Sequence, residues 1–135
     1  MTIAERTAFQ RAFWDRFLES VERPHLFKRG NESARWRYLP RVDLIVSHYI
    51  TGHSVGVFVR GRYGVKMPAV VERLWPHRAA LEAGLEVPLG NPRFPYVRHM
   101  QTQTRDMANW DRMIAWLHEA SELYECVLNR VVDPK

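Results

Sequence analysis

The chain has little of several features that usually carry protein chemistry. It contains one cysteine among 135 residues, so no internal disulfide bond can form. We therefore expect the protein to reside in the reducing cytoplasm. No apolar run reaches the length of about 18 residues that a membrane span needs, and we expect no membrane partner. Glycine-rich phosphate-binding loops and the Gly-x-Ser-x-Gly turn of hydrolases are also absent. These absences argue against membrane spans and against the common nucleotide-binding and hydrolase motifs.

What is present is typical of one folded domain. Hydrophobic residues make up 46% of the chain and charged residues 26%, which are ordinary globular values. A chain of this length buries a sizeable core without disulfide bonds or a structural metal. No linker, repeat or low-complexity stretch divides it. We therefore expect residues 1–135 to form a single domain.

The positive charge is concentrated in one part of the chain. The formal net charge is +5, and nearly all of the cations are arginines. Residues 23–66 hold nine basic residues against only Glu32 and Asp43, so the remainder of the chain is net negative. A one-sided basic surface attracts polyanions, and arginine binds phosphate with two parallel hydrogen bonds. A composition rich in arginine can equally reflect genomic base content.

Hydrophobic periodicity predicts three helices, at residues 3–21, 68–84 and 109–131. Thr2 and Glu5 form a capping box for the first helix, and Asn109 is the expected cap of the third. Pro76 should kink or split the middle helix, and Gly84 should end it.

Period-two alternation predicts strands at residues 35–39, 43–50 and 54–60, with a further strand at 96–101. Residues 51–53 between two of these strands form a hairpin turn in which Gly52 supplies the permissive dihedral angle. Residues 25–33 are expected to form a basic loop. The order of elements predicts an α+β domain, in which helices cover one face of an antiparallel sheet of about four to five strands.

The third helix carries a wider apolar arc than one core contact usually needs. Either this helix lies deep in the fold, or part of it meets a second copy of the chain. The homodimer hypothesis places the contact at Met113, Trp116, Ala120 and Leu123.

Metal and nucleophile chemistry find little support in the sequence. The six histidines show no zinc-motif spacing, and His48 is expected to be a hydrogen-bonded residue on a half-buried strand face. Cys126 stands among apolar residues and is expected to be a small buried hydrophobe. We expect no cofactor and no metal.

A nuclease interpretation depends on two carboxylates. A core of helix, three strands, helix and strand is shared with the restriction-endonuclease fold, whose enzymes hold a divalent metal with carboxylates on adjacent strands. Asp43 stands where the first carboxylate is needed, and Glu72 is the alternative second ligand. The intervening strand offers Arg60 and no carboxylate, which disfavours an active nuclease.

Nucleic-acid binding has a larger set of candidate residues. If 35–39 is a strand, Arg35 and Arg37 project from one side, and Trp36 and Tyr38 from the other. This predicts core aromatics and a surface row of arginines that neutralises phosphates. The sequence leaves open whether the basic block forms one patch. The candidate binding residues are Arg29, Arg35, Arg37, Arg41, Arg60, Arg62 and Lys66.

Four stretches carry a resemblance to a known family. They are Phe13 to Leu18, Trp36 with the hairpin strand Val55 to Val59, Leu74 to Gly84, and Asn109-Trp110 with Ala115 to Leu117. Together they resemble the bacterial domain-of-unknown-function family numbered 4268. The resemblance implies an α+β domain that often follows a nuclease-like domain tied to restriction or defence. Phe58 stands where that family's hairpin strand is expected to carry an acidic residue, and the resemblance implies no catalytic residues.

The leading functional hypothesis is a non-catalytic module that binds nucleic acid, or a partner that processes nucleic acid, through its arginine-rich face. One alternative is a metal-dependent nuclease with a rearranged site. The other is a dimeric interaction module whose basic face meets an acidic protein.

Overall fold

The computed structural model describes residues 2–134, which contain five strands and four α-helices. The α+β class predicted from the sequence is confirmed. In chain order the elements are α1 (Ile3–Glu19), β1 (Phe27–Asn31), β2 (Ala34–Leu39), β3 (Leu44–Ile50), β4 (Ser54–Arg60), α2 (Met67–Leu74), α3 (Arg78–Leu85), β5 (Arg98–Gln101) and α4 (Trp110–Val131). Short 3-10 turns precede β1, α3 and α4.

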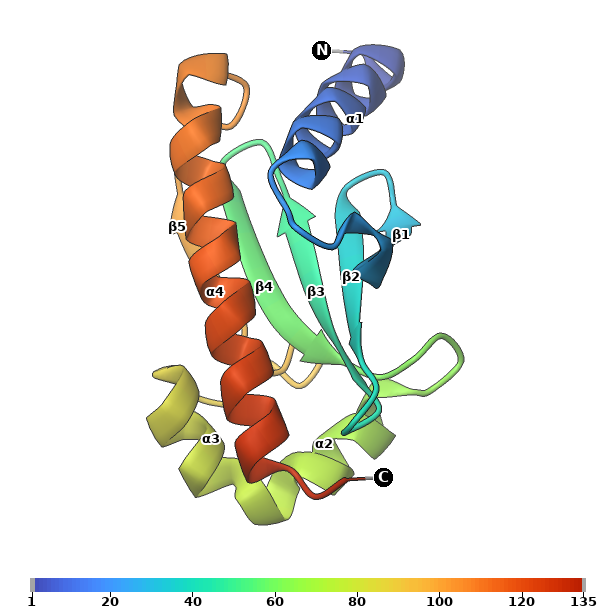
Figure 1. Ribbon diagram of the computed structural model, residues 1–135, viewed down its shortest axis with the longest axis vertical. Helices are drawn as coiled ribbons and strands as arrows, with labels where there is room; N and C mark the ends of the chain where they lie inside the picture. The colour runs from blue at the N-terminus through green and yellow to red at the C-terminus, as the bar shows by residue number, and fades with distance from the viewer. Residues whose placement is uncertain (1, 135) are drawn as a thin grey trace.

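The strands form one antiparallel sheet in the order β1-β2-β3-β4-β5. Helices α1 and α4 lie across one face of the sheet, and α2 and α3 close one end of it (Figure 1). The core fills the space between that face and the helices. Its largest buried side chains include Trp14, Phe17, Leu117 and Tyr124.

Helix α1 begins as predicted and ends two residues earlier. The Thr2 hydroxyl accepts a hydrogen bond from the Glu5 amide at 3.1 Å, as an N-cap does. At the other end the Ser20 hydroxyl donates to the Phe17 carbonyl at 2.6 Å. Such a bond offers the backbone an alternative to the next helical turn, so the helix stops at Glu19.

The basic loop expected at residues 25–33 was wrong, because most of it is strand β1. Phe27 to Arg29 pair with Arg37 to Arg35 of β2. The Asn31 side chain accepts from both the amide and the hydroxyl of Ser33 at 2.8 Å, which closes the turn between the strands. The strand is short and ends in polar residues, so its sequence shows no strand periodicity.

The β3–β4 hairpin is confirmed, although its turn closes differently from the prediction. Gly52 is not in the left-handed region. Instead the Thr51 hydroxyl accepts from the amides of His53 and Ser54 at 3.2 and 3.0 Å. Side-chain hydrogen bonds of this kind replace a glycine-dependent turn.

The middle helix is split at Pro76, as predicted, into α2 and α3. Gly84 does not end it. Glu86, with φ of 61°, takes the left-handed position after α3, while Gly84 lies inside the helix against Val127. A Cβ at Gly84 would lie 2.7 Å from the Val127 Cγ1 atom, so this glycine is needed for close helix packing.

Substitutions at Gly84 and Glu86 should therefore have opposite effects. Gly84→Ala should lower the free energy of unfolding by about 1–3 kcal/mol, because the new methyl group overpacks the contact with α4. Glu86→Gly should raise it by about 1 kcal/mol, because glycine relieves the left-handed backbone. Urea denaturation of both variants and the wild type measures the two changes. Changes of the same sign would contradict this assignment.

Helix α4 lies deep in the fold, which explains its wide apolar arc. One side packs on β3 and β4, and other parts meet α3 and α1, where Trp110 stacks edge-on against Phe13. Met113 and Ala120 are buried within the single chain and so are not exposed to a second copy, whereas the homodimer itself stays a prediction. Trp116 and Leu123 are half-buried against the same core. Asn109 is the N-cap residue of α4, as predicted, but its side chain makes no capping hydrogen bond; Asp106 accepts from the Ala108 amide at the start of the preceding turn.

Candidate nucleic-acid interface

The orientation of β2 decides which side chains can reach a ligand. Arg35 pairs with His48 of β3, and Arg37 pairs with Val46. Both partners are fully buried beneath the helices, so the two arginines lie on the helix-covered face of the sheet. Trp36 and Tyr38 lie on the opposite face, which we call the open face. The prediction of core aromatics and surface arginines on this strand was therefore wrong.

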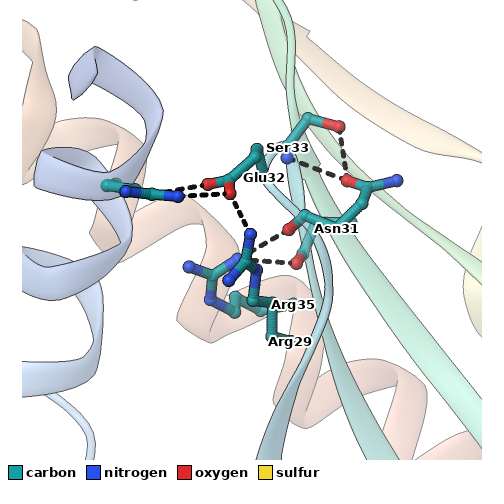
Figure 2. A network of polar contacts seen from close by, with 7 residues as sticks. Arg29, Asn31, Glu32, Ser33 and Arg35 are labelled. Atoms are coloured by element: carbon teal, nitrogen blue, oxygen red, sulfur yellow. Dashed lines mark hydrogen bonds and ion pairs between the residues drawn. The ribbon is translucent and has the colours of Figure 1, made fainter. Parts of the chain in front are cut away.

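Arg29 and Arg35 belong to a polar network beside α1 (Figure 2). Glu32 in the β1–β2 turn accepts two hydrogen bonds from Arg11 of α1, at 2.9 and 2.8 Å, and also pairs with Arg29. Arg35 is only 8% exposed and donates to the carbonyls of Asn31 and Ala34, each at 2.9 Å. Burial lowers the pKa of the Arg35 guanidinium. These arginines join α1 to the first hairpin.

Arg37 links β2 to α4 in a similar way. It forms an ion pair with Glu125 and a hydrogen bond to the Ser121 hydroxyl at 3.3 Å. Its guanidinium also lies 5.8 Å from the centroid of the Phe27 ring. Arg29, Arg35 and Arg37 thus make internal contacts, and the predicted basic block does not form one patch.

The other four predicted residues gather at one end of the sheet. Arg41 lies in the β2–β3 turn, Arg60 ends β4, and Arg62 and Lys66 follow in the loop to α2. Because β2 and β4 end where β3 begins, the turn and the loop are neighbours (Figure 1). An ion pair of 2.7 Å between Arg62 and Asp43 joins them. We call Arg41, Arg60, Arg62 and Lys66 the basic end.

The open face is lined with aromatic side chains next to the basic end. Trp36, Tyr38, Tyr49 and Phe58 are half-buried there, and Phe94 from the segment before β5 stacks edge-on against Phe58 at 5.3 Å. The rings of Trp36 and Tyr49 lie against Gly30 and Gly56 of neighbouring strands, where a Cβ would come within 2.3 Å of them. Two of the rings therefore extend along the sheet and cover glycine backbone.

Basic side chains lie next to these aromatic rings, and the strands that carry the rings contain no acidic residue. The Arg60 guanidinium lies 3.8 Å from the centroid of the Trp36 ring, and burial lowers its pKa. Lys28 of β1 pairs with Trp36 of β2, and its side chain is exposed. None of the five strands contains Asp or Glu. The sequence reasoning missed Lys28, Tyr49, Phe58 and Phe94, although alternation within the predicted β3–β4 hairpin could have indicated Tyr49 and Phe58.

His48 is fully buried on the helix face. Its Nδ1–H donates to the Arg35 carbonyl at 3.2 Å, while Nε2 is buried without a partner. Burial lowers the pKa of His48 to about 3, and the nearby Arg37 charge lowers it further, while backbone hydrogen bonds to Arg35 and Val46 offset only part of this. It is therefore neutral at physiological pH and acts as a core residue between Phe17 and Phe27.

Neutral burial of His48 predicts a loss of stability on acidification. The unfolded chain binds a proton near pH 6.5 and the folded chain near pH 3, so stability is lost as the pH falls between these values. From pH 7 to 5.5 the loss should be about 1 kcal/mol. In His48→Asn, whose amide replaces the Nδ1 donor, most of it should disappear. His53→Asn, on the exposed turn, is the control in pH-dependent urea denaturation. An unchanged loss in His48→Asn would contradict the buried neutral state.

A second candidate site is a groove of about 680 Å³ between α4 and the segment that follows α1. There Ser20 Oγ lies 2.7 Å from His118 Nε2, and Glu122 lies one helical turn beyond His118. Ser20, His118 and Glu122 are thus arranged in the order of a nucleophile, a base and an acidic partner of the base. However, Ser20 caps the carbonyl end of α1, where the helix dipole disfavours the negative charge of an acyl-transfer intermediate.

Cys126 lines the same groove and is exposed, so the expectation that it is buried was wrong. It lies on the outer side of α4, near the half-buried Leu123 and the buried Val127 that suggested a core environment. The structure therefore assigns it no packing role.

The two carboxylates of the nuclease interpretation have different surroundings. Asp43 is engaged by Arg62 and by the Tyr38 hydroxyl, whereas Glu72 lines an apolar groove along α2 beside Trp75. Among residues 2–134 no three His, Cys, Asp or Glu side chains are placed to hold a metal ion.

Comparison of the chain with protein-family models, curated proteins and solved structures found no match. The family resemblance therefore stays a prediction. Within the described part of the chain, no helix is long and apolar enough to cross a membrane. The open face and the basic end remain the surface whose chemistry points most directly to a ligand.

Proposed function

We propose that the protein binds single-stranded nucleic acid on the open face of its sheet and carries out no catalysis of its own. One observation carries the proposal: half-buried aromatic rings line a sheet face that has cations at its edges and no carboxylate in any strand. Aromatic rings stack with unpaired bases, and flanking cations neutralise phosphates. The bases and the phosphates of a single strand therefore each have a complementary surface on the protein.

The rings suit bases because of how they are held. Trp36 and Tyr49 lie against glycines, so their orientation is fixed before a ligand arrives. Phe58 lies on β4 with its ring 6.2 Å from that of Tyr49, and it is braced by Phe94. Stacking is tolerant of sequence, because every base has an aromatic face.

The basic end supplies the electrostatic part. Arg41, Arg62 and Lys66 are exposed, and Arg60 extends from β4 over Trp36. The Asp43 carboxylate, which opposes them there, is already paired with Arg62. An arginine beside an aromatic ring can place its planar guanidinium on a base while its N–H groups reach phosphate.

A single strand suits this surface better than a duplex. The rings are useful only to bases that are free of a partner strand, since paired bases are stacked inside the helix. Direct readout of a duplex instead requires a helix or ribbon that enters a groove. Here α1 and α4 occupy the opposite face, where Arg35 and Arg37 are bound internally (Figure 1).

Removing one ring should weaken binding to single strands. Trp36→Leu or Phe58→Leu keeps an apolar cover on the sheet and should raise Kd about fivefold or more, since stacking contributes about 1–3 kcal/mol per base. Trp75→Leu is the matched control, because Trp75 is an exposed tryptophan with Arg78 over its ring on another surface. Fluorescence anisotropy with a labelled oligonucleotide measures Kd. Equal weakening by the control, or no effect of either open-face variant, would contradict the proposal.

Removing cations should instead change the salt dependence. Arg41→Ala combined with Lys66→Ala should reduce the slope of log K against log salt by about 1.4, because each phosphate contact on a single strand contributes about 0.7. Arg6→Ala combined with Arg130→Ala removes the same charge from exposed positions on α1 and α4 and should leave the slope unchanged. A slope that depends only on net charge would make the two double variants alike and would argue against a localised site.

A further inference from the structure

Asp43 is a carboxylate at the basic end, and its position is unusual. Its backbone φ is 53°, in the left-handed region that side chains other than glycine seldom adopt, although Asp and Asn are enriched there. The residue directly precedes β3, opposite the end of β2. Its carboxylate therefore lies at the edge of the open face, beside the tip of Tyr38.

The contacts of this carboxylate leave room for a ligand. The Tyr38 hydroxyl donates to Oδ1 at 2.7 Å, and Arg62 Nε lies 2.7 Å from the same oxygen. A carboxylate has about four acceptor positions, so these two contacts use about half of them. The side chain is 16% exposed. Tyr38 and Arg62 thus fix the carboxylate while part of it still faces solvent.

The charge balance also suits a base contact. A free carboxylate would repel the phosphates of a bound strand, but the ion pair with Arg62 offsets its charge. The Tyr38 ring places the base-stacking surface directly beside the acceptor. A base that stacks on Tyr38 would present its hydrogen-bonding edge to Asp43.

We propose that Asp43 reads the base stacked on Tyr38 and selects guanine. This inference depends on the proposed binding of single strands. Guanine is the base that presents two adjacent donors, N1–H and the 2-amino group, and both can donate to Oδ2, the oxygen that Tyr38 and Arg62 leave free. Adenine and cytosine offer an amino donor beside an unprotonated ring nitrogen, and uracil offers one N–H between two carbonyl groups. Asp43 is thus a specificity-determining residue.

The test uses RNA heptamers of uridine whose central base is guanine, hypoxanthine, adenine, cytosine or uracil. We expect guanine to bind at least about fivefold more tightly than uracil, because two hydrogen bonds to a base edge discriminate to at least that degree. Hypoxanthine lacks the 2-amino group and should fall between them. If all five heptamers bind with equal, salt-sensitive affinity, the base-reading role is wrong and the proposed function stands. If none binds at low salt, both are wrong.

Asp43→Asn separates base reading from folding. Asparagine tolerates the left-handed backbone and still accepts a hydrogen bond from Tyr38, but it replaces one acceptor with a donor. The guanine preference should disappear while binding of the all-uridine heptamer persists. Asp111→Asn, at an exposed carboxylate paired with Arg16 on the helix side, should keep the preference. Retention of the preference in Asp43→Asn would overturn the assignment.

Discussion

Side chains alternate between the two faces of a strand, and in β2 this alternation places Arg35 and Arg37 beneath the helices. Two arginines in that position need partners, because an unpaired buried charge is costly. The chain supplies them with the carbonyls of Asn31 and Ala34 and with Glu125 of α4. The ion pair between Arg37 and α4 and the position of Trp36 and Tyr38 on the open face both follow from this orientation.

The same constraint separates the charges by role. On the helix face, cations meet carboxylates and carbonyl groups of the protein, as in the network around Glu32 (Figure 2). At the basic end, Arg41 and Lys66 are exposed and Arg60 lies over an aromatic ring. A net charge of +5 therefore says little about a ligand until the internal pairs are set aside. The predicted binding residues outside these internal pairs lie at the basic end, next to the aromatic rings of the open face.

Local signals made most of the fold predictable from the sequence. Thr2 caps α1, Pro76 splits the middle helix, and Val46 to Val59 alternate in a hairpin whose inward side is buried. Strand β1 was missed because its pairing with β2, rather than its own residues, makes it a strand. The inward side of β2 was also unpredictable, since it depends on residues of α1 and α4 that are distant in sequence. For the same reason, no local sequence pattern predicts the hydrogen bond between Ser20 and His118.

The most direct test of this account is to map a bound single strand by NMR chemical-shift perturbation. Adding a short single-stranded oligonucleotide at low salt should shift the amide and side-chain signals of Trp36, Tyr38, Phe58 and Arg60. Signals from the outer sides of α1 and α4 should stay in place. Shifts confined to the helix side, or to the groove beside His118, would contradict binding on the open face.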